Sequence, residues 1–183
     1  LQLNAAMDAG ALNSEQLVGL YLARIDAYDQ QGPALNAILT LNPNALERAR
    51  ELDRERLASG RRSALHGIPV VIKDNIDTAD MPTTAGSFLL KGSYPPDDAF
   101  VVKRLRDAGA IIIGKLNLSE FASGGAMNSL GGLIGNPHDL KRSPSGSSGG
   151  TGAAVAAAYA AFGLGTDTGG SVRSPSSANG IVG

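Results

Sequence analysis

Apolar residues recur at helical spacing near the start of the chain. After Asn13-Ser14, a pair typical of a helix N-cap, apolar side chains return every three or four residues and predict a helix that ends by position 32. A second helix is predicted to begin with Asn42 as its cap and Pro43 in its first turn, and to end at Gly60. Polar and charged residues fill the other positions, so both helices should lie on the surface of a larger body.

Two short runs of β-branched residues lack a helical period. Residues 68–72 and 110–113 are bounded by turn residues, which is typical of buried strands. Residues 78–96 between them are rich in Thr, Ser, Gly and Pro and predict a loop, and Asp97-Asp98 is predicted to cap a helix that runs to Ala108. A strand, a helix and a strand in this order predict a βαβ unit with parallel strands.

The last third of the chain alternates between glycine-rich loops and apolar segments. Residues 119–148 are rich in Gly, Ser and Asn and predict a long loop of the kind that often carries function. Residues 149–162 are apolar on all sides and predict a buried helix, and residues 162–166 predict a short strand. The fold class is therefore α/β, and we expect one domain over residues 1–183.

The composition removes several classes of function. The chain has 183 residues, of which 43% are hydrophobic, and its net charge is −1, so we expect no nucleic-acid or membrane partner. The absence of cysteine excludes disulfides, thiol nucleophiles and cysteine zinc sites. We interpret the two histidines, His66 and His138, as turn or loop residues rather than as a base or metal ligands, and we expect no metal or other cofactor.

The two ends of the chain carry a further expectation. No signal peptide opens the chain and no apolar run is long enough to span a bilayer, so we expect a cytoplasmic protein. The chain begins at Leu1 rather than Met and ends in the apolar residues Ile-Val-Gly183. We therefore expect a portion of a longer protein that continues at the C-terminal end.

Two segments partly match nucleotide-binding motifs. Gly109–Lys115 has the glycine and lysine spacing of a phosphate-binding loop, but Leu116 follows where Ser or Thr belongs, and the residues between predict a strand. Gly163-Leu-Gly165 begins a dinucleotide fingerprint, but Thr168 stands where the third glycine belongs. A nucleotide-binding module is therefore an alternative that titration with ATP or NAD would test, and we expect no binding.

Two glycine-rich serine loops and one lysine carry the candidate chemistry. The loops are Ser145-Gly-Ser-Ser-Gly-Gly150 and Gly165-Thr-Asp-Thr-Gly-Gly-Ser171, and Lys73 ends the apolar strand. A serine hydroxyl is a poor nucleophile until a base removes its proton, and burial lowers the pKa of a lysine so that it can be that base. Consecutive amides of a glycine-rich loop can converge into an oxyanion hole. The pattern indicates a serine nucleophile activated without histidine.

These motifs resemble the amidase signature family, the Ser–cis-Ser–Lys hydrolases. The resemblance covers most of the chain and is carried by Gly67-Ile-Pro-Val-Val-Ile-Lys-Asp74, Gly114-Lys-Leu-Asn-Leu-Ser-Glu-Phe121, Ser147-Ser-Gly-Gly150 and Gly165-Thr-Asp-Thr-Gly-Gly-Ser-Val-Arg173. It implies a mixed β-sheet sandwiched between helix layers. Family members are much longer, so the resemblance also implies that several strands and most of the substrate pocket lie beyond residue 183.

The resemblance assigns roles residue by residue. It implies that Ser171 is the acyl-forming nucleophile, that Ser147 is a bridging serine preceded by a cis peptide bond, and that Lys73 is the base. The amides of the nucleophile loop would bind the oxyanion: Thr168, Gly169, Gly170 and Ser171. Three further positions would brace the site: Ser148, Asp167 and Arg173.

The implied activity is hydrolysis of a small-molecule carboxylic amide to acid plus amine or ammonia, through an acyl-enzyme. The bond broken is a carbon–nitrogen bond other than a peptide bond, and a homodimer is a further expectation. An alternative within the family is the glutamine-hydrolysing A subunit of a tRNA-dependent amidotransferase, which needs partner chains. Asn136-Pro-His-Asp-Leu140 and Ser143–Ser148 are more similar to general bacterial amidases. A non-catalytic piece is the last alternative, and an active-serine probe would exclude it by labelling Ser171.

Overall fold

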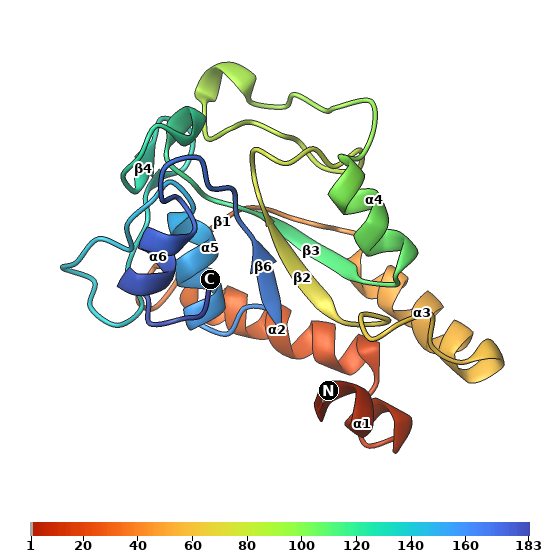
Figure 1. The fold of residues 1–183 in the computed structure, drawn as a ribbon. Helices are drawn as coiled ribbons and strands as arrows, with labels where there is room; N and C mark the ends of the chain where they lie inside the picture. The colour runs from red at the N-terminus through yellow and green to blue at the C-terminus, as the bar shows by residue number, and fades with distance from the viewer. Residues whose placement is uncertain (1) are drawn as a thin grey trace.

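The computed structural model describes residues 2–183 and centres on a mixed four-stranded sheet (Figure 1). The strand order is β1-β3-β2-β6, where β2 is parallel to both of its neighbours and β1 is antiparallel to β3. The bounds are β1 (Ile38–Leu41), β2 (Pro69–Lys73), β3 (Ile111–Leu116) and β6 (Phe162–Leu164). The α/β class with a mixed sheet is confirmed, as are the parallel strands of the βαβ unit.

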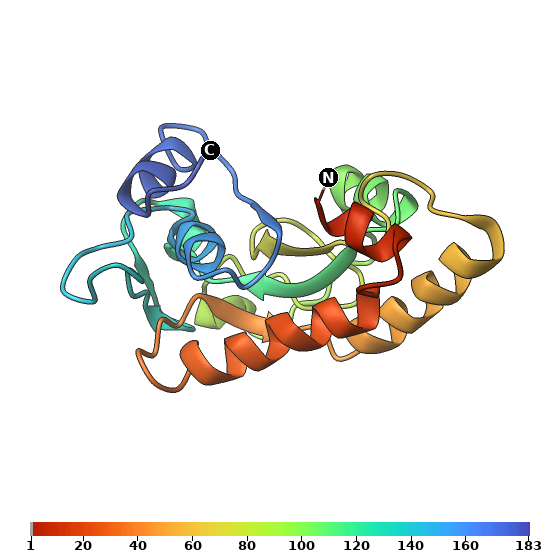
Figure 2. The same cartoon turned by 90° about the horizontal axis from the view of Figure 1, so that it is seen from below.

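Helices cover both faces of this sheet. They are α1 (Gln2–Asp8), α2 (Ser14–Tyr28), α3 (Ala45–Ser59), α4 (Phe100–Asp107), α5 (Gly149–Ala156) and α6 (Arg173–Ala178). One face packs on α2, α3 and α5, and its core includes Val71 and Leu116. The other face packs on α4 through Ile72 and Ile112. Figure 2 shows α2 and α3 next to each other along one side of the molecule.

The first two predicted helices form, with one shifted boundary. The Asn13 side chain accepts a hydrogen bond from the Gln16 amide in a reciprocal capping box, so α2 begins where the sequence predicts. The second prediction is wrong at its start, because the cap of α3 is Asn44 rather than Asn42. The Asn42 side chain instead accepts the Asn44 amide and donates to the Ile112 carbonyl, which ties this turn to β3.

Two later helices differ from the predicted lengths. The cap of α4 is Ala99 rather than Asp97-Asp98, because the Asp98 carboxylate accepts the amide of Ala79 at 2.8 Å. The helix α5 ends at Ala156 rather than at residue 162, since Ala158 turns into the left-handed region with φ 55° and leads the chain back to β6. The shorter helix leaves room for β6 to pair with β2.

Some elements were not predicted. The strand β1 has four residues and no alternating pattern, and its pairing with β3 defines it. The helices α1 and α6 were missed, and so were the short hairpin of β4 (Met127–Asn128) and β5 (Gly132–Leu133) and the 3-10 turns at Phe88–Leu90 and Glu120–Ala122. These turns and the hairpin lie in segments predicted as loops. No helix among residues 2–183 has the length and apolar character that crossing a membrane requires.

Candidate active site

Lys73 ends β2 with a side chain that is 0% exposed. Its ammonium donates to two hydroxyl oxygens, Ser147 Oγ at 2.7 Å and Thr166 Oγ1 at 2.8 Å. Burial lowers the pKa of Lys73 to about 8, and the charge of Asp167 opposes this shift. A lysine with this pKa is partly neutral near neutral pH, and the neutral form can accept a proton.

Ser147 lies in the loop that leads into α5, where the peptide bond from Gly146 is cis, as the resemblance implies. The residue is fully buried, and its carbonyl accepts the amide of Ser119 at 3.1 Å. A Cβ at Gly146 would overlap the carbonyl of Gly125, so this close approach requires glycine. The loop is thereby packed from two sides and presents the Ser147 hydroxyl to Lys73.

Ser171 lies in the loop between β6 and α6 and is partly exposed. Its carbonyl accepts the amide of Ser148 at 3.3 Å, which places the loop that bears Ser171 beside the start of α5. Within residues 2–183 no hydrogen bond joins the Ser171 hydroxyl to Ser147. The structure therefore brings Lys73 and Ser147 into direct contact, and holds Ser171 in the adjoining loop through its backbone.

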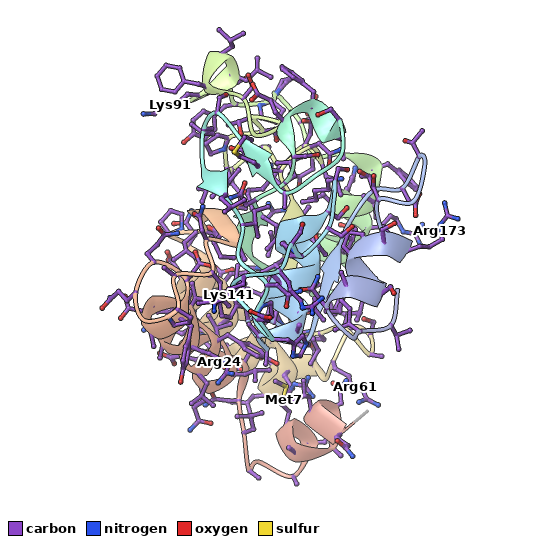
Figure 3. All side chains as sticks on the ribbon, turned by 90° about the vertical axis from the view of Figure 1, so that its left-hand side faces the viewer. Met7, Arg24, Arg61, Lys91, Lys141 and Arg173 are labelled. Carbon is purple, nitrogen blue, oxygen red and sulfur yellow. The ribbon has the colours of Figure 1, made fainter. Side chains whose placement is uncertain are left out.

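The Asp167 carboxylate shapes the loop that bears Ser171. It accepts the amides of Gly170 at 2.5 Å, Val172 at 3.1 Å and Arg173 at 3.3 Å, together with the Arg173 guanidinium at 3.1 Å. The Arg173 hydrogen bond and these amides hold the pKa of Asp167 well below its usual range. The Arg173 side chain is 74% exposed, and Figure 3 shows it at the outer edge of the molecule. The carboxylate therefore stays ionised and fixes the loop from Asp167 to Arg173.

The amides of this loop are not equivalent. The Gly170 N–H is bound by Asp167, whereas the N–H groups of Thr168, Gly169 and Ser171 have no hydrogen-bond partner in the part of the chain that the structure describes. Gly170 has φ +113°, a conformation that only glycine adopts readily. Donors for a developing negative charge are therefore available on both sides of Gly170.

Ser148 joins the two serine loops. It caps α5 and is 1% exposed, and its hydroxyl lies 3.3 Å from both the carbonyl and the amide of Thr166. The hydroxyl donates to the first and accepts from the second. This double contact fixes the end of β6 against the start of α5.

A family model described as Amidase matches residues 16–183. The chain belongs to the amidase family. The A subunit of the glutamyl-tRNA(Gln) amidotransferase of Acidothermus cellulolyticus is 46% identical over the whole chain, which covers 36% of that protein. A putative amidase of Schizosaccharomyces pombe is 46% identical over the whole chain, which covers 32% of it.

Solved structures of this amidase family agree with the fold. The native peptide amidase of Stenotrophomonas maltophilia has a TM-score of 0.94 at 49% identity, over 97% of this chain and 37% of that one. The A subunit of the glutamyl-tRNA(Gln) amidotransferase of Thermotoga maritima has a TM-score of 0.75 at 40% identity, over 90% of this chain and 33% of that one. The chain thus spans about a third of the length of these relatives.

Two polar residues at the candidate site were not predicted. Thr166 accepts from Lys73, and the Asn75 side-chain amide donates to the same Thr166 oxygen at 3.0 Å. Both residues stand inside or beside the quoted motifs, but their meeting depends on the pairing of β6 with β2, in which Leu164 lies opposite Ile72. The one signal in the sequence that could have pointed to Thr166 is a hydroxyl side chain just after the short strand β6.

The lysine of the partial phosphate-loop match and the two histidines have other partners than the serine loops. Lys115 is buried on the other face of the sheet and forms an ion pair with Asp74 at 3.1 Å. His66 Nε2 lies 2.9 Å from the Leu52 carbonyl, and His138 Nε2 lies 2.9 Å from the Asn179 carbonyl. Among residues 2–183 no group of three or more His, Cys, Asp or Glu is placed to hold a metal ion. The histidines are therefore held by backbone carbonyls, and among the described residues neither forms a hydrogen bond with Lys73, Ser147 or Ser171.

Proposed function

We propose that the protein hydrolyses carboxylic amides to an acid and an amine or ammonia through an acyl-enzyme on Ser171. The observation that carries the proposal is the buried Lys73, which lies 2.7 Å from the Ser147 hydroxyl and has a pKa of about 8. Membership of the amidase family supports a hydrolase that acts on carbon–nitrogen bonds. A small-molecule amide is the substrate class that we propose.

Neutral Lys73 starts the reaction by taking the proton of Ser147, which takes the proton of Ser171. The Ser171 oxygen then attacks the amide carbonyl and forms a tetrahedral oxyanion. When this intermediate collapses, the C–N bond breaks and the proton returns through Ser147 to the leaving nitrogen. Water releases the acid from the acyl ester by the same proton path, and Ser171 regains its hydrogen.

The oxyanion binds to backbone amides of the nucleophile loop. Thr168, Gly169 and Ser171 supply N–H groups that are free of partners among the described residues, whereas the Gly170 N–H is held by Asp167. Gly170 acts by letting the loop curl, and Asp167 with Arg173 holds that shape. Ser148 keeps the loop beside Ser147.

A second candidate is the glutamine-hydrolysing A subunit of a tRNA-dependent amidotransferase. Relatives described as the A subunit of glutamyl-tRNA(Gln) amidotransferase, 46% and 48% identical, favour it, and the same serines and lysine would serve. The two candidates differ in their need for partner chains. Glutaminase activity that appears only when other subunits are co-purified would favour this second candidate.

An active-serine probe tests the proposal. A fluorophosphonate should label Ser171 in the intact protein, and Ser171→Ala should lose both labelling and amine release. Ser177→Ala, an exposed serine of α6, is the matched control and should retain both. Amide hydrolysis that persists in a purified Ser171→Ala variant would refute the assignment.

A further inference from the structure

Lys73 has a second hydroxyl partner that the reaction above does not use. Thr166 Oγ1 lies 2.8 Å from Lys73 Nζ, nearly as close as Ser147 Oγ at 2.7 Å. Thr166 follows β6, and the parallel pairing of β6 with β2 carries it to the end of the strand that bears Lys73. The lysine is therefore held between two hydroxyl groups from two different loops.

The Thr166 hydroxyl is itself oriented by Asn75. The Asn75 side-chain amide donates to Thr166 Oγ1 at 3.0 Å, so this oxygen accepts from Asn75 and from Lys73. A hydroxyl oxygen has two acceptor sites, and both are filled. The hydrogen of the Thr166 hydroxyl must therefore point away from the lysine, and Thr166 acts on Lys73 as an acceptor.

The backbone of Thr166 is fixed relative to the serine loop. Its amide and its carbonyl both contact the Ser148 hydroxyl at 3.3 Å, and Ser148 directly follows Ser147. The distance between the two acceptors of Lys73 is thereby set by hydrogen bonds that do not involve the lysine. Such a frame keeps its geometry while the lysine gains and loses a proton.

We propose that Thr166 is a positioning residue that, together with Asn75, aims the Lys73 nitrogen at Ser147. The charged lysine donates one N–H to each hydroxyl. When its proton leaves along the Ser147 contact, the N–H bound to Thr166 stays in place, so the lone pair that remains faces Ser147. The return of the proton restores the starting arrangement. This inference rests on the function proposed above, because it assumes that Lys73 exchanges a proton with Ser147.

The charges around Lys73 set the sign of the expected pH effect. Asp167, from the loop after β6, raises the lysine pKa, and its partner Arg173 shares that loop. Asp74 and Lys115 pair with each other on the other face of the sheet. An acceptor for the ammonium stabilises the charged form, so its removal should lower the pKa of Lys73 below about 8.

The test compares Thr166→Val with Thr166→Ser in the intact protein. Valine keeps the shape and the backbone contacts but removes the acceptor, whereas serine keeps the hydroxyl. We expect Thr166→Val to lower kcat roughly tenfold to a hundredfold with little change in KM, the loss typical of a hydrogen bond to a charged group. Its labelling rate of Ser171 by a fluorophosphonate should rise with pH at a lower midpoint than in the unsubstituted protein. Thr166→Ser should recover most of kcat, and the pH midpoint of Ser171 labelling should return to that of the unsubstituted protein.

Two further variants separate positioning from a structural role. Thr151→Val removes a buried hydroxyl that contacts the Leu164 carbonyl, and it should leave the pH midpoint unchanged. Asn75→Leu frees the Thr166 hydroxyl to rotate, so it should lower kcat less than Thr166→Val, and it provides the test if Thr166→Val does not fold. A pH midpoint equal to that of the unsubstituted protein in Thr166→Val, or a kcat equally low in Thr166→Ser, would overturn the role of Thr166. Failure to label Ser171 in the unsubstituted protein would instead overturn the proposed function.

Discussion

Two buried lysines stand at the ends of adjacent parallel strands, and their surroundings differ. Lys73 and Lys115 are both 0% exposed, but they lie on opposite faces of the sheet. Lys115 forms an ion pair with Asp74 at 3.1 Å and donates to Thr83 Oγ1 at 2.7 Å. Lys73 has two hydroxyl partners and, among the residues that the structure describes, no carboxylate in contact.

The comparison shows that the hydrogen-bond and ion-pair partners of a buried lysine, rather than its burial alone, determine whether it can exchange a proton. Burial lowers the pKa of both lysines. Beside Lys115, the Asp74 carboxylate opposes that shift and holds the charge in place, as a buried ion pair must. Beside Lys73, both hydroxyls can accept from the charged form, and the Ser147 hydroxyl can give up a proton to the neutral form. One lysine is therefore suited to stabilise the fold, and the other to exchange protons.

The largest expected effect is on activity. Lys73→Met removes the proposed base but keeps most of the side-chain volume, so kcat should fall roughly a hundredfold to ten-thousandfold while the protein stays folded. Amine release and circular dichroism measured on the same sample check both halves of this prediction. Activity near that of the unsubstituted protein would place the base elsewhere.

The matching substitution on the other face should act on stability. Lys115→Met leaves the Asp74 carboxylate buried without its partner, which should lower the free energy of unfolding by about 3–5 kcal/mol. Denaturant unfolding of the intact protein measures this loss. The double variant Lys115→Met/Asp74→Asn should regain much of it, because the asparagine removes the buried charge while its amide oxygen can still accept from Thr84. Equal losses in the two variants would contradict the ion-pair account.

A smaller effect is expected on the pH dependence of the free energy of unfolding. The pKa of Lys73 is about 8 in the folded protein, against 10.5 for an ordinary lysine, so the unfolded chain binds more protons between these values. Stability contributed by this residue should therefore rise as pH increases from about 8 to 10.5. Comparison of unfolding curves for the unsubstituted protein and Lys73→Met across this range isolates the contribution. A slope that is the same in both proteins would count against a depressed pKa.

The smallest expected effects come from the ion pair of Asp167 and Arg173, whose carboxylate raises the pKa of Lys73 through its charge without contacting the lysine. Asp167→Asn removes the charge that raises the lysine pKa, so the pH midpoint of Ser171 labelling should fall. Arg173→Gln removes the positive charge that partly neutralises Asp167. The carboxylate should then raise the pKa of Lys73 further, so the pH midpoint of Ser171 labelling should rise. The pair is exposed to solvent, and we expect shifts of a few tenths of a pH unit, about the scale of surface ion pairs. Shifts of the labelling midpoint in the same direction in both variants would show that the charges of this pair do not set the pKa of Lys73.

The sequence predicted the elements whose residues carry a local signal. The β-branched runs predicted β2 and β3, and the capping pair at Asn13 predicted the start of α2. The strand β1 has no such signal, since its four residues become a strand only by pairing with β3. The alanine-rich run after Gly149 was predicted as one long helix, because composition alone does not show where the chain must turn back to β6.

The candidate site was predicted in part for the same reason. The lysine and the serine loops are visible as motifs, and the contact of Lys73 with Ser147 follows the family pattern. Thr166 and Asn75 were missed because they meet only through the pairing of β6 with β2. The engagement of the Gly170 amide by Asp167 is likewise a matter of loop conformation, which glycine permits in several forms.

The rate at which a fluorophosphonate labels Ser171, measured across pH in the intact protein and in Lys73→Met, tests the central claim most directly. If Lys73 is the base, the rate should rise with a midpoint near 8, and the rise should disappear in Lys73→Met. A rate that does not depend on pH, or a rise that survives in Lys73→Met, would contradict the account.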